Sequence, residues 1–399
     1  MKKLLIVGAG FLQSFVIQKA VSMGYETIAI DANPNADGFL YAHKHAVIDI
    51  VDKEACLEYA KLECIDGVLT AATDYGVLTA SYIADQMSLP GLNYEVAKKI
   101  KNKYLVRKCL FDNQVDDNEQ CYLVSNIDDA VIIKDRLRYP VFVKPCDGSG
   151  SRGTSRVDNS SELMCACEIA INNSITHCAV IESFILGSEY GVESIVVNGD
   201  IHVLGIMKKW MTNPPYYAEL GHSMPSGLST AILIKAEQCV TKAIQALKIN
   251  HGSVNMDLLI TENGELYIVD IGARMGGNLI GSCVIPYGTG IDYMAAIIRN
   301  ALGEPVDLTT NKHEAVATRL LAFDEGVIKR MPDMQELEKR YEVEIYHHMR
   351  EGMCVHEYHT NLDGCGYIVA KAPSVNTAEM KASLVYERIK KDAFEEQYE

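Results

Sequence analysis

The chain has 399 residues, 48% of them hydrophobic and 23% charged, which is the composition of a folded globular protein. Its formal net charge of −16 argues against a nucleic-acid partner or an anionic membrane surface, because both are bound mainly through clustered Lys and Arg. No apolar stretch approaches membrane-spanning length, and a chain of this size predicts two or three domains.

The twelve cysteines are scattered, with no C-x-x-C pair and no metal-finger spacing. In a long chain this pattern favours reduced, mostly buried thiols and a cytoplasmic location. The opening Met1-Lys2-Lys3 and the apolar run 4–7 superficially resemble a signal peptide. Because that run is short and passes directly into Gly8-Ala9-Gly10, a buried first strand fits better.

The first 93 residues alternate short apolar, β-branched runs with helix-patterned segments. Strands are expected at 4–7, 27–30, 46–50 and 67–70, and helices at 15–23 and 53–62. Such alternation is typical of a parallel sheet wound by right-handed crossovers. Residues 1–93 are therefore interpreted as one α/β domain that ends near Pro90-Gly91.

The strand pattern changes after a helical stretch at 94–111 and an acidic connection at 112–120. Strands are expected at 139–144, 178–182, 192–197, 201–208, 254–260 and 265–271. The turn sequences Asn198-Gly199 and Asn263-Gly264 are hairpin signals, so these strands are expected to form antiparallel sheets with helices on one side. From about residue 309 a third region carries a strand at 366–370 and a helix beginning near Asn376, with Glu379 placed for a capping box.

A glycine pair follows the first strand. Gly8-Ala9-Gly10 opens a predicted helix and Asp31 ends the next strand, as in a dinucleotide-binding fingerprint. The third glycine is absent, since position 13 is Gln, so a structural turn is an equally good interpretation. An NAD(P)-dependent oxidoreductase is kept as an alternative. Asp74 follows an apolar strand where α/β sheets place ligand-facing residues, and is either a substrate contact or a helix cap.

A lysine and a glycine-rich loop suggest a phosphate site. Lys144 stands at the exit of an apolar strand, and a run of glycines, hydroxyls and Arg152 follows it. The loop comprises Gly148, Ser149, Gly150, Ser151, Arg152 and Gly153. Backbone N–H groups of such a loop can close over phosphate oxygens, and the two basic side chains add positive charge. The alternative is a flexible surface loop.

Two aspartates are expected to face one another. With a two-residue turn at Asn263-Gly264, Glu262 pairs with Glu265, and counting outward Asp257 pairs with Asp270 on the same face. Like charges about 5 Å apart repel, so two aspartates in apolar strands need a cation. Carboxylates without His or Cys nearby favour magnesium that bridges nucleotide phosphates. Alternatively, one aspartate faces solvent or caps a turn.

Arg274 follows the second of these strands. It could hold a transferring phosphoryl group or a substrate carboxylate, and Gly276 and Gly277 would let the backbone approach that oxyanion. The alternative is that Arg274 only forms a salt bridge with the aspartates.

With these motifs in order, the chain resembles the ATP-grasp superfamily, in its carboxylate–amine ligase branch. The resemblance implies an α/β fold with a Rossmann-like preATP-grasp domain at 1–93 and an ATP-grasp region at 94–308. Within that region a lid is implied at about 113–183 and a catalytic core at about 184–308. An α+β domain at 309–399 completes the chain.

The resemblance also implies roles for individual residues. Lys103 and Lys144 would reach the ATP phosphates, and Arg152 and Arg274 would join Lys144 in catalysis. The segment 181–189 resembles the adenine hinge: Glu182 would lie near the adenine amino group, Ser183 and Ile185 would bond the base through backbone, and Glu189 would bind the ribose. Asp257 and Asp270 would hold the metal. Substrate contacts are expected at Asp74, His222, Arg274, Gly276, Gly277 and Asn278, and an aromatic substrate loop is expected to carry Trp210, Tyr216, Tyr217 and His222.

The implied activity is ATP-dependent joining of a carboxylate to an amine through an acyl phosphate, with ATP and Mg²⁺ (Mn²⁺ as an alternative ion). The expected partners are the small-molecule carboxylate and amine, with a homodimer as an option. Amino-acid ligases, phosphoribosylglycinamide synthetase and the carbamoyl-phosphate synthase and biotin carboxylase type enzymes share these motifs. Both metal positions are Asp where relatives often have Glu, and position 272 is Gly where many have Asn. A non-catalytic ATP sensor therefore remains an alternative.

Overall fold

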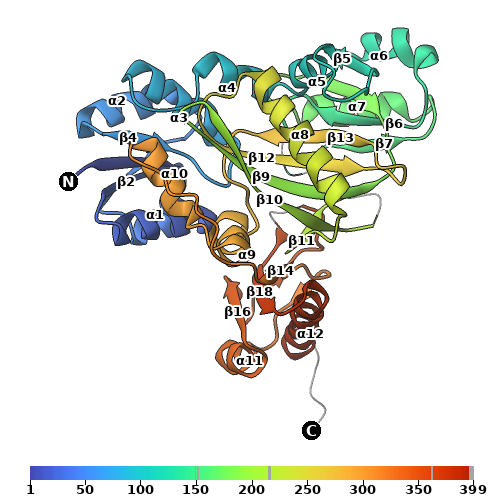
Figure 1. Cartoon of the computed structure of the whole chain (residues 1–399). Coiled ribbons are helices and arrows are strands. Elements are labelled where there is room, and N and C mark those ends of the chain that lie inside the picture. The colour runs from blue at the N-terminus through green and yellow to red at the C-terminus, as the bar shows by residue number, and fades with distance from the viewer. Residues whose placement is uncertain (149, 151, 214–216, 361–362, 395–399) are drawn as a thin grey trace.

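The structure is a computed structural model that describes residues 1–148, 150, 152–213, 217–360 and 363–394. Ser149, Ser151 and Tyr216, which the sequence places in the phosphate and substrate loops, lie outside the described residues. Figure 1 shows a long central sheet that continues into the C-terminal strands, with the N-terminal sheet and the small sheet of residues 121–183 beside it. Within the described residues, no helix is long and apolar enough to cross a membrane.

The N-terminal sheet is parallel throughout, as predicted. Its strands are β1 (Lys3–Val7), β2 (Glu26–Asp31), β3 (Lys44–Val47) and β4 (Gly67–Leu69), in the order β3-β2-β1-β4. The helical elements here are α1 (Phe11–Ser22), η1 (Asp37–Leu40), α2 (Lys53–Glu63) and α3 (Tyr75–Gln86). The apolar β1 is buried because helices cover both faces. Asp74 follows β4 at the carboxyl end of the sheet.

The helical stretch predicted at 94–111 is two helices rather than one. They are α4 (Tyr94–Lys101) and α5 (Lys103–Asp112). Asn102 between them is extended, and its side-chain oxygen accepts a hydrogen bond from the Leu105 N–H at 3.0 Å. Asn is a strong N-cap, so it ends one helix and starts the next. Lys103 is thereby placed in the first turn of α5.

A small antiparallel sheet follows. Its strands are β5 (Cys121–Val124), β6 (Val141–Pro145), β7 (Ser155–Val157) and β8 (Ala179–Ser183), in the order β5-β8-β6-β7. The helical elements with it are α6 (Ile127–Ile133), η2 (Lys134–Arg136) and α7 (Leu163–Asn172). Apolar residues of both helices and all four strands form one buried cluster. The two helices therefore lie on one face of this sheet.

The central sheet has eight antiparallel strands and continues into the C-terminal region. In spatial order they are β13 (Leu266–Gly272), β12 (Gly252–Ile260), β9 (Ser188–Val197), β10 (Asp200–Met211), β11 (Glu219–Met224), β14 (Ala315–Leu320), β18 (Gly366–Ala372) and β16 (Val343–His347). The other elements are α8 (Thr230–Leu247), η3 (Ile280–Val284), α9 (Ile285–Thr289), α10 (Tyr293–Ala301), β15 (Gly326–Val327), α11 (Met334–Tyr341), β17 (Cys354–Val355) and α12 (Val375–Phe394). Residues 309–399 thus contribute three strands to this sheet.

Of the two predicted hairpin turns, one is confirmed and one is wrong in length. Asn198 and Gly199 form a two-residue turn, with φ of 52° and 88°, between paired Val197 and Asp200. The second loop spans three residues, because the Thr261 N–H donates to the Glu265 carbonyl at 3.0 Å. A β-bulge at Val269 adds one residue to β13 and restores the pairing of Asp257 with Asp270. The aspartate pairing is therefore confirmed, although the turn assumed for it is wrong.

The cap predicted for the C-terminal helix is also wrong. The helix α12 begins at Val375, and the Ser374 hydroxyl accepts a hydrogen bond from the Thr377 N–H at 3.2 Å. Glu379 instead accepts a hydrogen bond from the Ser223 hydroxyl of β11 at 2.7 Å. A serine two residues earlier supplies the cap, which leaves Glu379 free to contact the central sheet.

Candidate functional site

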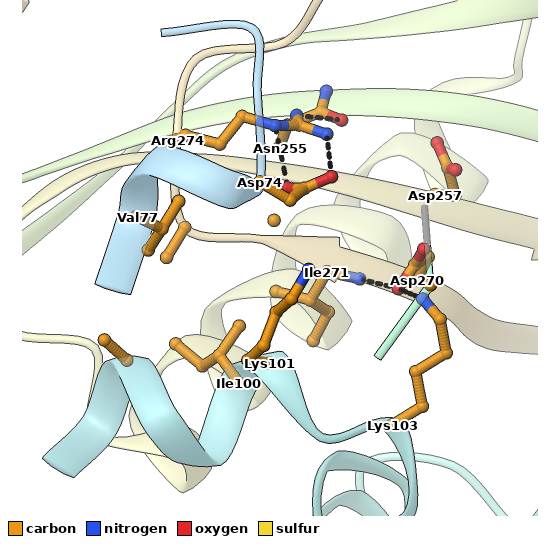
Figure 2. A pocket seen from close by; sticks show the side chains of 14 residues that line it. Asp74, Val77, Ile100, Lys101, Lys103, Asn255, Asp257, Asp270, Ile271 and Arg274 are labelled. Atoms are coloured by element: carbon orange, nitrogen blue, oxygen red, sulfur yellow. Dashed lines mark hydrogen bonds and ion pairs between the residues drawn. The ribbon is translucent and has the colours of Figure 1, made fainter. Parts of the chain in front are cut away.

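A cavity of about 420 Å³ lies where the N-terminal sheet, the small sheet and the central sheet meet. Its described lining includes residues from every region that the sequence associates with the site. They include Asp74, Lys103, Lys144, Gly148, Gly150, Arg152, Glu189, Asp257, Asp270, Arg274, Gly277 and Asn278. A smaller adjoining pocket of about 50 Å³ shares Asp74, Lys103, Asp257, Asp270 and Arg274 with it, and its lining is drawn in Figure 2.

Asp270 forms an ion pair with Lys103, the first residue of α5. Lys103 Nζ lies 2.5 Å from Asp270 Oδ1, and Figure 2 shows the two side chains meeting from α5 and β13. Burial alone would raise the pKa of Asp270, but the positive charge of Lys103 outweighs it and lowers that pKa. The Asp270 carboxylate is therefore ionised and available to a cation.

The bulge at Val269 also positions Lys144. With Val269 unpaired in the ladder, its carbonyl accepts a hydrogen bond from Lys144 Nζ at 3.3 Å. Lys144 Nζ also donates to Glu182 Oε2 at 3.0 Å. Burial would raise the pKa of Glu182, but Lys144 and Arg107 outweigh this effect and lower it. Glu182 therefore orients the lysine at the edge of the cavity as an ionised carboxylate.

Asp257 is paired with a lysine that the sequence did not single out. Lys209 Nζ lies 2.9 Å from Asp257 Oδ1, 2.6 Å from Glu219 Oε1 and 3.4 Å from Glu189 Oε2. Burial disfavours the charge on Lys209, but the three carboxylates outweigh burial and raise its pKa well above the usual value. Asp257, Glu189 and Glu219 therefore share one ammonium group.

Arg274 connects the central sheet to the N-terminal sheet. Its Nη2 donates to Asp74 Oδ2 at 3.2 Å, and its Nη1 donates to Asn255 Oδ1 at 3.2 Å (Figure 2). Burial opposes the charge, but Asp74 outweighs it and raises the pKa of Arg274 further above its usual value. A Cβ at Gly272 would lie 2.9 Å from both Asp74 Oδ1 and the guanidinium carbon of Arg274. Glycine at this position therefore makes room for the pair.

The segment after Arg274 is held by a buried glutamate. Glu193 Oε1 accepts hydrogen bonds from the Tyr293 hydroxyl at 2.6 Å and from the Gly276 N–H at 3.1 Å. Burial raises the pKa of Glu193 to about 7, although the bonds from Tyr293 and Asn255 oppose this. Because the Gly276 N–H is used by Glu193, Gly277 is the better placed of the two glycines to approach a ligand, and it lines the cavity.

The phosphate loop reaches the cavity through some of its predicted members. Gly148, Gly150 and Arg152 line it, whereas Gly153 packs near Asn173, which lies 2.7 Å from where a Cβ would be. Arg152 donates a hydrogen bond to the Tyr75 hydroxyl and lies over that ring at 5.8 Å. The loop therefore contacts the start of α3 in the N-terminal region.

The proposed adenine hinge lies at the end of β8. Ser183 closes the strand, and its hydroxyl accepts a hydrogen bond from Gln120 Nε2 at 3.1 Å. Ile185 lies between β8 and β9, and Glu189 lies in β9 and lines the cavity. The backbone of this connection is positioned between the two sheets that border the cavity.

The expectation of an aromatic substrate loop is only partly met. Tyr217 lies in the connection between β10 and β11 and lines the cavity. Trp210 and His222, by contrast, lie in β10 and β11 themselves. His222 is 1% exposed and its Nδ1 has no hydrogen-bond partner among the described residues. Burial lowers the pKa of His222 to about 4, so the imidazole is neutral at pH 7.

Four contributing residues were missed by sequence reasoning. They are Arg107, Lys209, Glu219 and Asn255. A signal existed for Asn255, since it lies two residues before Asp257 and alternate strand residues share a face. Lys209 and Glu219 meet only because β10 pairs with β11, and the sequence contains no marker for that pairing.

The donors in the cavity fit a magnesium ion bound together with a nucleotide. Among the described residues, no three His, Cys, Asp or Glu side chains are arranged as a complete metal shell. Magnesium is usually held by one or two carboxylates together with substrate phosphates and water. Asp257 and Asp270, opposite each other on the ladder, provide that pair of carboxylates.

Comparisons with known proteins match part of this chain to a described domain. Residues 137–282 match the family model described as an ATP-grasp domain. The chain is 24% identical to a formate-dependent phosphoribosylglycinamide formyltransferase of Sulfurisphaera tokodaii, over 82% of each chain. It is also 24% identical to an L-arginine-specific L-amino acid ligase of Bacillus subtilis, over 74% of this chain and 73% of the relative.

Solved structures extend the similarity to nearly the whole fold. An L-amino acid ligase from Bacillus licheniformis superimposes with a TM-score of 0.84 at 22% identity, over 97% of each chain. A phosphoribosylglycinamide synthetase from Anaerococcus prevotii gives a TM-score of 0.77 at 24% identity, over 97% of this chain and 98% of that one. These likenesses establish the fold, and the matched model identifies residues 137–282 as an ATP-grasp domain. The chain therefore contains an ATP-grasp domain within a fold that it shares with an L-amino acid ligase and a phosphoribosylglycinamide synthetase.

Proposed function

We propose that this enzyme activates a carboxylate with ATP as an acyl phosphate and transfers the acyl group to an amine. The proposal is carried by the convergence of Asp257, Asp270 and Arg274 on one cavity. Lys103 and Lys144 border the same space. This set places positive charge and two metal carboxylates where a triphosphate and a carboxylate could meet.

In the first step a substrate carboxylate oxygen bonds to the γ-phosphorus and the bond to ADP breaks. Lys103 and Lys144 would then stabilise charge on the phosphates, and Arg274 would hold the transferring phosphoryl group or the substrate carboxylate. Magnesium held by Asp257 and Asp270 would supply additional charge neutralisation. In the second step the amine nitrogen bonds to the acyl carbon, phosphate leaves, and the amine loses a proton.

The charge distribution in the cavity favours an amino acid over a phosphorylated amine. Several residues of the described lining outside the phosphate loop are neutral or apolar, among them Leu12, Thr360 and Tyr367. Lys209 is already paired with carboxylates, and Arg274, paired with Asp74, is the group proposed above for the transferring phosphoryl group or the substrate carboxylate. A phosphoribosyl group would need additional Lys or Arg side chains for its phosphate.

The test is ADP release with Mg-ATP against a matrix of carboxylates and amines. The matrix includes pairs of amino acids, and glycine with phosphoribosylamine. Asp270→Asn is the inactive variant, and Asp324→Asn, on an exposed residue outside the cavity, is its matched control. We expect ADP release with an amino-acid pair in the wild type and in Asp324→Asn, and none in Asp270→Asn.

Three other outcomes are informative. ADP release only with glycine and phosphoribosylamine would replace the amino-acid assignment with a purine-pathway ligase. Binding of Mg-ATP without ADP release from any pair would support a nucleotide sensor and oppose the ligase assignment. Full activity in Asp270→Asn would remove that residue from the metal site.

A further inference from the structure

One buried lysine is surrounded by carboxylates in the wall of the cavity. Lys209 has a side chain that is 2% exposed, and its ammonium lies 2.6 to 3.4 Å from oxygens of Glu219, Asp257 and Glu189. An ammonium has three N–H donors, so these three carboxylates can use all of them. Lys209 therefore has a carboxylate oxygen within 3.4 Å for each of its three donors.

The contacts that the three carboxylates make with Lys209 have the lengths of ammonium–carboxylate ion pairs. Magnesium binds oxygen at about 2.0–2.1 Å, whereas nitrogen–oxygen contacts of charged pairs are longer. In agreement, the described part of the chain contains no triad of acidic, His or Cys side chains close enough to bind a metal. The contact uses Oδ1 of Asp257 and leaves Oδ2 for an ion shared with Asp270.

We propose that Lys209 is the resident cation of this part of the site. It balances the charge of Asp257, Glu189 and Glu219, and it confines the divalent ion to the position between Asp257 and Asp270. This inference rests on the metal role proposed above for those two aspartates. Its consequence is that removal of Lys209 creates room and negative charge for one further divalent ion.

Removal of Lys209 would leave the charge of the surrounding carboxylates unbalanced. Without Lys209, three carboxylates that are largely buried would lie close together with no positive charge between them. The repulsion between like charges is stronger in a largely buried site than in water, because the effective dielectric constant there is lower. A divalent cation that enters would relieve it, and the site would bind metal in the absence of nucleotide.

The test is a Mn²⁺ titration of the nucleotide-free protein, with free Mn²⁺ measured by electron paramagnetic resonance. The variants are Lys209→Met and its neighbour Lys208→Met, whose side chain is 44% exposed and lies over the Trp210 ring. We expect Lys209→Met to bind one more Mn²⁺ per chain than the wild type does. If the number of bound ions is the same, we expect the variant to bind Mn²⁺ at least about tenfold more tightly than the wild type. Lys208→Met should match the wild type. A folded Lys209→Met with unchanged Mn²⁺ binding would overturn the proposal.

A second variant covers the case in which Lys209→Met does not fold, since an unpaired buried charge is strongly destabilising. The double variant Lys209→Met, Glu219→Gln has one negative charge fewer and should still bind the additional Mn²⁺ through Asp257 and Glu189. If it binds no more than the wild type, the proposal is wrong. Asp270→Asn, titrated with Mn²⁺ in the presence of a non-hydrolysable ATP analogue, separates the two proposals: if it binds Mn²⁺ as the wild type does under the same conditions, the metal site itself fails, whatever Lys209 does.

Discussion

At the scale of single residues, Gly272 shows how the absence of a side chain shapes this site. It ends strand β13 next to the Asp74–Arg274 pair, and a Cβ there would lie 2.9 Å from an atom of each member of the pair. The asparagine that the family resemblance leads one to expect at this position would displace Arg274 from Asp74. The glycine is therefore matched by a local contact that needs it.

Gly272→Asn should accordingly lower kcat by roughly a hundredfold, because a displacement of about 1 Å at a catalytic group can have that effect. The measurement is steady-state ADP release with the substrates found in the matrix. Gly199→Asn is the matched control, since its hairpin glycine has nothing within 4 Å of the Cβ position and a left-handed backbone that Asn tolerates. If Gly272→Asn has the kcat of the wild type, the contact with Asp74 is not needed to position Arg274.

His222 predicts a pH dependence of stability. Its pKa is about 4 in the folded chain and about 6.5 when unfolded, so the unfolded chain binds the proton more tightly. The stability linked to His222 is complete above pH 6.5 and is lost as the pH falls toward 4. The loss at pH 5 should be about 2 kcal/mol. The measurement is urea unfolding at pH 7.5 and pH 5. The free energy of unfolding should fall between these pH values by about 2 kcal/mol less in His222→Gln than in the wild type. Equal slopes in both proteins would contradict the argument.

The sequence was informative where a residue's chemistry conflicted with its surroundings. Aspartates in apolar strands identified Asp257 and Asp270, and their pairing proved correct. The two errors in that derivation, a loop one residue too short and an unforeseen bulge, cancelled each other in the register. Lys209 and Glu219 gave no comparable signal, because their meeting depends on which strands become neighbours. Long-range pairing of this kind is set by packing of the whole sheet and not by local pattern.

At the scale of elements, the break between α4 and α5 places a lysine of the site. Hydrophobic periodicity predicted one helix over 94–111, since both helices present apolar residues to the same cluster. Asn102 interrupts it by capping α5, and its Oδ1 also accepts a hydrogen bond from Cys146 Sγ at 3.2 Å. The cap determines where the first turn of α5 begins, and therefore where Lys103 meets Asp270.

Asn102→Ala should lower the free energy of unfolding by about 1 kcal/mol, which is typical for loss of an N-cap. It should also raise KM for ATP, because Lys103 loses its fixed position. Asn102→Asp, which retains a capping oxygen, should stay close to the wild type in stability. The checks are urea unfolding and ADP release as a function of ATP concentration. If the Ala and Asp variants are equally stable, the side chain of Asn102 does not define the start of α5.

At the scale of the whole molecule, the cavity is an assembly of segments far apart in sequence. Asp74 comes from the N-terminal region, Asp257 and Arg274 from the central sheet, and Tyr367 from the C-terminal region. Tyr367 donates a hydrogen bond to Asn278 Oδ1 at 3.1 Å and stacks on Phe11 with ring centroids 6.5 Å apart. The C-terminal region therefore helps form the same site and packs against the first helix.

This continuity bears on the domain boundary predicted at residue 309. The strands β14, β18 and β16 extend the central sheet from β11, and Val316, Leu320 and Val369 share a buried cluster with Leu4 and Ile6 of β1. A chain that ends at 308 would expose the edge of β11 and leave part of that cluster open to water. Exposed strand edges and apolar surface promote association between chains.

Residues 1–308 expressed alone should therefore be aggregated or largely insoluble, and co-expression with residues 309–399 should restore a soluble complex. The measurements are the soluble fraction and size-exclusion chromatography, with thermal stabilisation by Mg-ATP as the test of a formed site. A monomeric, cooperatively unfolding 1–308 fragment that Mg-ATP stabilises as well as it does the full chain would show that residue 309 separates independent folding units. We expect no such independent folding, because the buried cluster contains side chains of both β1 and the C-terminal strands and neither fragment can bury it alone.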